Sequence, residues 1–419
     1  MSNKIDTSKK NSIILFLIWP FFALTYAIRN YKAVWAKDII WFFVIFYGYT
    51  IAVHDVGEAT MDANRYRDKF IAMAAKEVSF REISATFYDA EEQSLDILET
   101  IIIFSLSRVT NNPQVLFAVF GIIFGYFYSR NIWYLVDRVG LKIIQENIPI
   151  LLTFAFIVGF SSINGFRFWT ATHMFLYGVL PFLFEGKKQY LWITLLSALM
   201  HFSFLLPLAI LGIYFFVGNQ ILIYFFFFII TFFIKELDLN VVRDFLTNNL
   251  PEIFLPKVTT YTNTDYAEGL TTLFEQVNWY IKFYSMALKW SVTIFLVVIF
   301  FTGKKFYTKH INFNNLLNFT FLFYSISNVI SLVPSGARFL NLANLFALAF
   351  IFFYVQYAPR GKTLRRLITV AVPALALFTI VSIRIAFDTM GVLSVFGNPF
   401  LSLVFKLDIT LIEMVKAAL

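Results

Sequence analysis

The sequence has no cysteine among its 419 residues, and charged residues are scarce. The lack of cysteine excludes disulfide bonds, thiolate metal sites and cysteine nucleophiles. Asp, Glu, Lys and Arg make up 14% of the chain, whereas a soluble domain carries roughly 25%. The composition therefore excludes an ordinary soluble globular protein.

Common motifs of nucleotide, hydrolase and metal sites are also missing. The chain contains no P-loop, no Gly-x-Ser-x-Gly element and no Asp-x-Asp pair of the kind that holds a metal-bound sugar nucleotide. His54 and His173 stand alone, without the spacing of metal ligands. We therefore expect no metal site and no cofactor.

Apolar runs of membrane length recur along the whole chain. Hydrophobic residues make up 59% of the sequence and the mean hydropathy is +0.71. No polar stretch is long enough for a separate soluble domain, so we predict one all-α polytopic membrane domain, residues 1–419, with about 12 transmembrane helices. The apolar segments are 12–28, 38–53, 95–107, 114–133, 148–160, 165–184, 189–203, 205–217, 220–234, 282–302, 314–333, 338–357 and 366–384.

The basic residues predict orientation in the bilayer. The formal net charge is +8, but Lys and Arg form short clusters between apolar segments, which is the topogenic pattern of membrane proteins. We therefore expect no nucleic-acid partner. Two long polar stretches, 54–94 and 235–281, are acidic on balance and are predicted to lie outside.

The run 95–107 decides the direction of every later span. It is about 13 residues, or roughly 20 Å of helix, and it carries Asp96 and Glu99. If it spanned, the positive-inside rule would be violated repeatedly. We therefore predict an amphipathic helix at the outer surface, within an outside segment that covers 54–112.

The start of the chain leaves two interpretations open. A basic stretch precedes residues 13–28 without a small-x-small cleavage site, which predicts an uncleaved anchor. The topology above puts Lys4, Lys9 and Lys10 outside, against the positive-inside rule. A re-entrant first segment broken at Pro20 would remove that conflict.

The run 190–217 is too long for one span and short for two. The direction of the chain requires two short helices of about 15 residues each, which would meet near residues 201–207 and leave a depression below the outer surface. This turn contains His201 and Ser203. Non-helical backbone at that depth is tolerated where it is buried in protein or lines a wet cavity.

Isolated arginines are predicted at the same outer level. Arg167 lies in SSINGFRFWTATHMFL, Arg338 in VPSGARFL, and Arg384 near the end of the last span. A charge at the centre of a span costs about 2.5–3.5 kcal/mol, and a guanidinium is suited to phosphate oxygens. A lipid-linked diphosphate is a ligand that fits. The alternative is that each arginine only reaches the interface from a helix end.

Candidates for proton transfer and sugar binding lie in the turn and in the first outside stretch. His201 has the chemistry to take a proton from a sugar hydroxyl, and so do the carboxylates Asp62 and Glu92. Tyr66 is a candidate to stack on a sugar, and Ser203 to bind one. Each also has a plain structural interpretation, as a packing residue or as part of a solvated loop.

The order of these motifs resembles the EpsG-like exopolysaccharide polymerases, which are related in role to the Wzy polymerases of O-antigen synthesis. The likeness covers roughly residues 38–357. In the family pattern, Ala63 replaces a tyrosine and Phe168 stands where glutamine is usual. The matching elements, in order, are Asp62 with Tyr66, Glu92 with Leu95 and Leu98, TNNPQVLF, Phe166 and Arg167 with Ala171, KKQYLWITLLSALMHFSF through Ala198, His201 and Ser203, and Arg338.

The resemblance implies a metal-independent inverting glycosyltransferase of the GT-C type in a bacterial cytoplasmic membrane, with its active site on the extracytoplasmic side. Its substrate would be an undecaprenyl-diphosphate-linked oligosaccharide, and a flippase and a chain-length regulator would be partners. Arg167 and Arg338 would bind the donor diphosphate, while His201, Asp62 or Glu92 would be the base. A ligase that moves a finished glycan to another acceptor, and a transporter or flippase, remain alternatives.

Overall fold

The computed structural model describes residues 2–53, 62–76, 78–87, 95–140, 142–264, 269, 272, 275–359 and 361–418. Regular structure in these residues is helical, and an isolated antiparallel β-bridge joins Gly391 and Thr410. The predicted all-α class is confirmed for this part of the chain.

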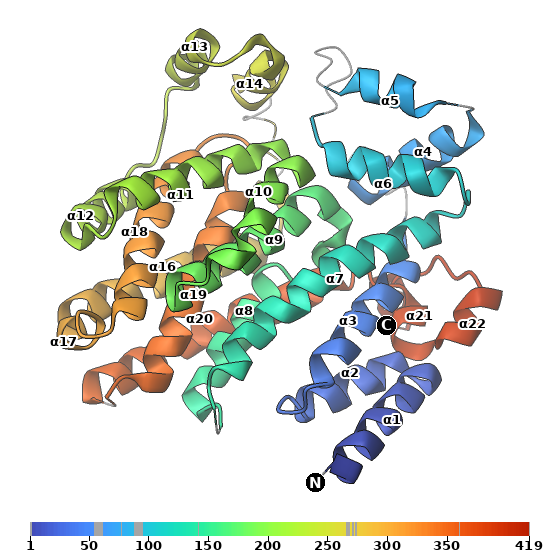
Figure 1. Ribbon diagram of the computed structural model, residues 1–419, viewed down its shortest axis with the longest axis horizontal. Helices are drawn as coiled ribbons and strands as arrows, with labels where there is room; N and C mark the ends of the chain where they lie inside the picture. Colours follow the sequence, from blue (N-terminus) through green and yellow to red (C-terminus); the bar gives the residue numbers. More distant parts are fainter. Residues whose placement is uncertain are drawn as a thin grey trace.

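The α-helices form one bundle (Figure 1). They are α1 (Ser2–Ile18), α2 (Pro20–Arg29), α3 (Ala36–Tyr49), α4 (Asp62–Ala75), α5 (Phe80–Thr86), α6 (Ile97–Ser107), α7 (Pro113–Asp137), α8 (Ile148–Ile157), α9 (Phe166–Glu185), α10 (Leu191–Met200), α11 (Leu205–Val217), α12 (Ile221–Phe232), α13 (Leu239–Asn249), α14 (Leu255–Tyr261), α16 (Trp279–Thr302), α17 (Lys304–Tyr307), α18 (Ile311–Ile330), α19 (Arg338–Tyr357), α20 (Lys362–Ala386), α21 (Val392–Phe396), α22 (Pro399–Val404) and α23 (Leu411–Ala418).

Within the described residues, five helical segments are long and apolar enough to cross a membrane by length and composition. Shorter apolar helices cover 97–107, 202–217 and 221–232. The chain is therefore a membrane-embedded helical protein, and the count of about 12 spans stays a prediction. The five segments are Pro113–Asp137, Gln145–Glu185, Trp279–Thr302, Arg338–Tyr357 and Lys362–Ala386.

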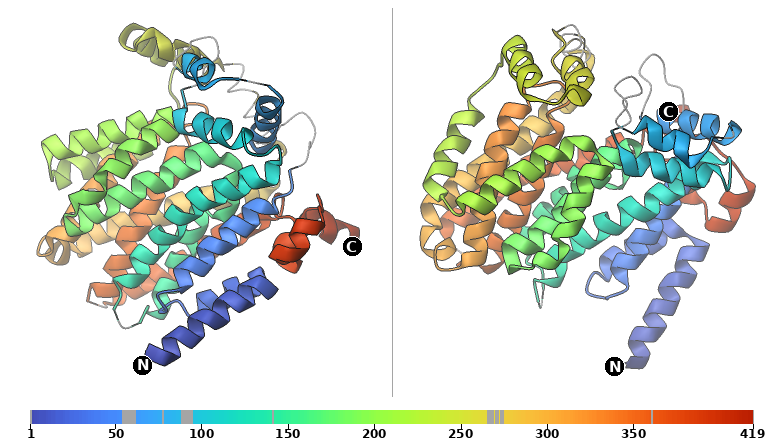
Figure 2. Two further views of the ribbon diagram at one scale, coloured as in Figure 1. Left: turned by 45° about the vertical axis from the view of Figure 1, so that its right-hand side comes forward. Right: turned by 45° about the horizontal axis from the view of Figure 1, so that its top comes forward.

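Both long polar stretches lie at one end of the bundle. Helices α4–α6 and helices α13–α14 are together at the end opposite the N-terminus, which we call the upper end (Figures 1 and 2). The common placement agrees with the expectation that both stretches face the same side of the membrane.

The opposite end, which we call the basic end, contains the connections between α2 and α3, α7 and α8, α9 and α10, α16 and α18, and α19 and α20. Contacts hold these connections together: Arg138 pairs with Glu185, the Tyr357 hydroxyl donates to the Arg138 carbonyl, and Phe306 packs on Tyr354. The positive-inside rule would assign this end to the cytoplasm. Its basic residues include Arg29, Lys32, Arg138, Lys142, Lys187, Lys188, Lys304, Lys305, Lys309, Lys362, Arg365 and Arg366.

The first apolar segment is two helices instead of one. Trp19 leaves helical geometry at φ −153° and ψ 91°, and Pro20 begins α2. Proline lacks an N–H and is tolerated in the first turn of a helix, so it breaks the chain here and starts a new helix. Helices α1 and α2 pack together as a hairpin, and the N-terminus lies away from the upper end (Figure 2). Of the two interpretations, the break at Pro20 is the one the structure has.

Helices α3 and α7 pack closely because glycines face the contact. A Cβ atom on Gly48 would lie 2.2 Å from the Phe117 carbonyl oxygen, and one on Gly121 would lie 2.8 Å from the Val44 carbonyl oxygen. Small residues at such contacts let helices approach in membranes. This packing places the first half of α7, with Phe117 and Phe120, under the polar residues of the upper end.

Candidate functional site

Arg167 lies in the first turn of α9, which follows the 3₁₀-helix η2 (Phe160–Gly165) at the upper end. Its Nε donates to the Tyr66 hydroxyl at 3.1 Å, and its Nη1 donates to Asp96 Oδ2 at 2.9 Å. The side chain is 34% exposed. Arg167 is therefore held by two partners from the segment 54–112, which a side chain that only reaches the interface would not need.

Asp96 joins that arginine to the turn between α10 and α11. Its side chain is 8% exposed, Oδ2 accepts from Arg167, and Oδ1 accepts the Phe202 backbone N–H at 2.9 Å. Each carboxylate oxygen of Asp96 therefore accepts a hydrogen bond, and the two donors belong to different segments, α9 and the turn after α10. In the sequence, Asp96 is visible only as a charge in a short apolar run. The one local sign of a role in the site is the position of this acid directly before an apolar helix.

Helix α6 turns its polar side chains inward. Lys69 of α4 donates to Glu99 Oε2 at 2.9 Å and to the Thr100 hydroxyl at 3.2 Å, and Glu99 is buried. The placement of this helix at the upper end agrees with the prediction for 95–107. Within this helix and the residue before it, Asp96 and Glu99 have cationic partners, Arg167 and Lys69.

Tyr66 of α4 is the second partner of Arg167. Its ring is 3% exposed, stands edge-on to Phe120, and lies 5.5 Å from the Arg167 guanidinium carbon. Burial raises the pKa of Tyr66 to about 12, although the nearby Arg167 acts in the opposite direction. The phenol therefore stays protonated at neutral pH, and it serves as a partner for Arg167 instead of as a base.

The predicted meeting of two short helices is confirmed at residues 201–204. Helix α10 ends at Met200, His201 is extended at φ −149° and ψ 118°, and the 3₁₀-helix η4 (Phe202–Phe204) leads into α11. His201 is 7% exposed, stacks on Phe202 and meets the Phe168 ring edge-on, both with centroids 5.3 Å apart.

The hydrogen bonds of His201 identify its tautomer. Nδ1 accepts the Ser203 backbone N–H at 3.3 Å and lies 2.8 Å from the Ser203 hydroxyl. Because a backbone N–H can only donate, Nδ1 carries no proton, and the neutral ring carries its proton on Nε2. Ser203 thus orients the ring, and His201 offers an N–H donor at Nε2.

Arg338 is the first residue of α19, at the same end of the bundle. Its guanidinium carbon lies 5.7 Å from the centroid of Phe168, the ring that also meets His201. Among the described residues, no hydrogen bond or ion pair of Arg338 is found. The preceding turn is tight: Ser335 has φ +62°, and a Cβ atom on Gly336 would lie 1.9 Å from the Ile330 carbonyl oxygen.

Asp62, the first residue of α4, lies beside the start of α9. The Ala63 backbone N–H donates to Asn164 Oδ1 at 3.0 Å, which ties α4 to η2. Asp62 pairs with Arg65, and a Cβ atom on Gly165 would lie 3.7 Å from Asp62 Oδ2. Its side chain is 20% exposed and adjoins the residues around Arg167.

The second polar stretch covers the same turn. Phe254, in the 3₁₀-helix η5 (Glu252–Phe254), stacks on Phe202 with ring centroids 6.5 Å apart. Lys257 of α14 is half-buried, and burial lowers its pKa; Asp96 opposes that change, while Arg167 acts with it. Lys257 was not predictable from the sequence, because one lysine in a polar loop carries no signal of its own.

The structure therefore brings most of the predicted site residues to one place. His201 lies within electrostatic reach of four charged side chains, those of Arg167, Arg338, Asp62 and Asp96. Arg384 is not among them, because it pairs with Asp388 at 2.6 Å one turn along its own helix end. Glu92 and His54 lie outside the described residues. No group of three or more His, Asp or Glu side chains able to hold a metal occurs in the described ranges.

His173 lies apart from this cluster and is a packing residue. Its Nε2 lies 2.9 Å from the Val158 carbonyl oxygen and its Nδ1 lies 3.2 Å from Asn131 Nδ2, so both ring nitrogens have partners. Phe124 and Tyr128 meet its ring edge-on.

Searches against protein-family models, curated proteins and solved structures found no match to this chain. The resemblance to the EpsG-like polymerases therefore depends on the motifs in the sequence, and the site is defined by its geometry.

Proposed function

We propose that this protein is a polysaccharide polymerase of the bacterial cytoplasmic membrane. It would transfer a growing glycan from undecaprenyl diphosphate to the sugar of an incoming lipid-linked repeat unit. The observation that carries the proposal is the convergence of two arginines on the turn at His201: Arg338 lies over Phe168, the ring that meets His201, and Arg167 is joined through Asp96 to the backbone N–H of Phe202. The substrate and the polymerase activity come from the motif resemblance.

The cations are suited to a diphosphate. Arg167 uses Nε and Nη1 on Tyr66 and Asp96, and Nη2 has no partner among the described residues. Helices α9 and α19 both begin at this end without a capping side chain, and the N-terminus of a helix carries a partial positive charge. Two arginines and two helix N-termini would stabilise the negative charge that develops as the diphosphate leaves, which is usually the largest catalytic contribution in such sites.

The tautomer of His201 favours different roles for His201 and Asp62 in the proton chemistry. With its proton on Nε2, His201 would donate a hydrogen bond to a diphosphate oxygen. Asp62 would accept the proton of the attacking hydroxyl. The hydroxyl oxygen then bonds to the anomeric carbon as the bond from that carbon to the diphosphate oxygen breaks, which inverts the configuration and needs no metal ion.

A reconstitution experiment tests the proposal. The purified protein is placed in liposomes with the lipid-linked oligosaccharide that accumulates in cells lacking this gene, and the products are separated by size. A polymerase yields a ladder from this substrate alone. A ligase yields a single transfer that depends on a separate acceptor, and a flippase moves labelled substrate across the bilayer without changing its size. Either of these results would contradict the proposal.

A further inference from the structure

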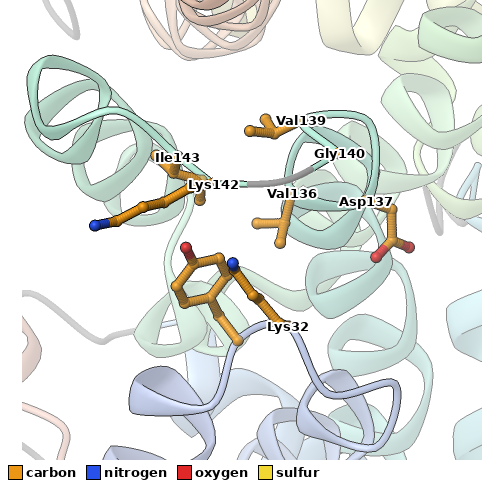
Figure 3. A pocket seen from close by; sticks show the side chains of 8 residues that line it. Lys32, Val136, Asp137, Val139, Gly140, Lys142 and Ile143 are labelled. Carbon is orange, nitrogen blue, oxygen red and sulfur yellow. The ribbon is translucent and has the colours of Figure 1, made fainter.

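A polar cavity lies at the basic end, away from the candidate site at the upper end. It has a volume of about 180 Å³ and lies between the α2–α3 turn and the connection that follows α7 (Figure 3). Its polar lining includes Tyr31 and Lys32 from the first segment and Lys142 from the second. A water occupies about 30 Å³ of liquid, so the cavity has room for a larger group.

The side chains around the cavity form an amphipathic pocket. Val136, Val139 and Ile143 are buried and supply an apolar wall. Tyr31, Lys32 and Lys142 supply polar groups to the same cavity. One carboxylate, that of Asp137, also lines the cavity, and it lies on the side away from Lys142 (Figure 3).

Contacts outside the cavity hold its two walls in place. The Gln356 side-chain amide donates to the Lys142 carbonyl at 3.2 Å and accepts from Asn147 Nδ2 at 3.0 Å. On the other wall, Tyr26 stacks on Trp35 at 5.7 Å, which closes the α2–α3 turn. The walls therefore depend on packing that the lysines do not supply.

We propose that this pocket binds the phosphate of an anionic membrane phospholipid. Two ammonium groups and a phenol match a phosphate diester, and the buried aliphatic wall matches the start of the acyl chains. The pocket lies among the clustered Lys and Arg residues of the basic end, and basic pockets between helices at that level bind anionic headgroups. Arg138, which is adjacent in the chain to the lining residues Asp137 and Val139, is paired with Glu185, and the basic side chains that line the cavity are Lys32 and Lys142.

Native mass spectrometry of the full chain in detergent tests the proposal. The protein is titrated with phosphatidylglycerol and, separately, with phosphatidylcholine. The unmodified protein should retain phosphatidylglycerol preferentially. Lys32→Gln with Lys142→Gln should weaken that retention about 25-fold, since each lysine near an anionic headgroup contributes roughly a factor of five.

The control pair is Lys187→Gln with Lys188→Gln, two lysines of the same end that do not line the cavity. It should retain phosphatidylglycerol like the unmodified protein. Lys32→Arg with Lys142→Arg keeps both charges and should also retain it, which separates loss of binding from loss of folding. Equal retention by both glutamine pairs would overturn the proposal. If inorganic phosphate at millimolar concentration displaces the lipid and binds alone, the site takes free phosphate and the lipid assignment is wrong.

Discussion

Arg138 at the basic end and Arg338 at the upper end differ in their partners. At the basic end, Arg138 pairs with Glu185, donates to the Tyr134 carbonyl and lies over the Tyr134 ring. At the upper end, Arg338 contacts the face of Phe168 and has no acceptor among the described residues. The guanidinium of Arg338 is therefore available to an anionic ligand, as the proposed function requires, whereas that of Arg138 is already paired with Glu185.

Arginine-to-lysine changes should separate the two ends most strongly. Arg167→Lys or Arg338→Lys should lower polymer formation by about 100-fold or more, because lysine lacks the planar fork that binds phosphate oxygens and such donors contribute about 10²–10³ in rate. Arg138→Lys should keep the rate within about threefold. The measurement is the rate of ladder formation per folded protein in liposomes. A full-length ladder from Arg167→Lys would rule out its diphosphate role.

Asp96 provides the next largest contrast. Asp96→Asn should lower the rate about tenfold, because it removes the charge that orients Arg167 and weakens the bond to the Phe202 N–H. Glu99→Gln, on the same helix, removes only the partner of Lys69 and should keep the rate within about twofold. Thermal unfolding of both variants serves as the folding control. If Glu99→Gln is as slow as Asp96→Asn, Asp96 has no specific role in the site.

Alanine substitutions of the two buried histidines, His201 and His173, should separate an effect on activity from an effect on stability. His201→Ala should slow the reaction about tenfold and lower the stability less than His173→Ala does, because only Nδ1 of His201 has a protein partner among the described residues, whereas both ring nitrogens of His173 have one. His173→Ala should lower the free energy of unfolding by about 1–3 kcal/mol, because it leaves buried partners without hydrogen bonds. Chemical denaturation and rate per folded protein measure the two effects. The reverse pattern would make His201 structural.

Tyr66→Phe should have the smallest effect, a two- to tenfold lower rate, because it removes one hydrogen bond to Arg167 worth about 0.5–1.5 kcal/mol. Because the pKa of Tyr66 is raised to about 12, the phenol keeps its proton throughout the range in which the rate is measured. The rate profile of the variant between about pH 6 and pH 9 should therefore have the same shape as that of the unmodified protein. A step that disappears in the variant would show that Tyr66 titrates during turnover.

Local sequence patterns predicted the positions of several site residues. The run 190–217 was too long for one helix, and the chain breaks where His201 and Ser203 stand. Arg167 and Arg338 were expected at the outer ends of helices, and both lie in first helical turns at the upper end. These predictions hold because hydropathy and helix length act over short stretches of chain.

The partners of these residues were not predictable in the same way. Asp96 is 71 residues from Arg167 in the chain, and Phe202 is 106 residues from Asp96. Nothing in either local pattern identifies the other. Arg384 was grouped with Arg338 as an isolated arginine at a span end, yet it pairs with Asp388, so isolation in the sequence could not separate a paired arginine from one without an acceptor.

The sequence by itself determined that this is a helical membrane protein and which residues stand at the ends of its helices, because apolar length, charge and helix breaks are properties of contiguous residues. Only the tertiary structure decided that Asp96 and Tyr66 hold Arg167, that Phe168 contacts both Arg338 and His201, and that Phe254 stacks on Phe202 in the turn. Those contacts join segments distant in the chain, and packing among helices, rather than any local preference, sets which of them meet.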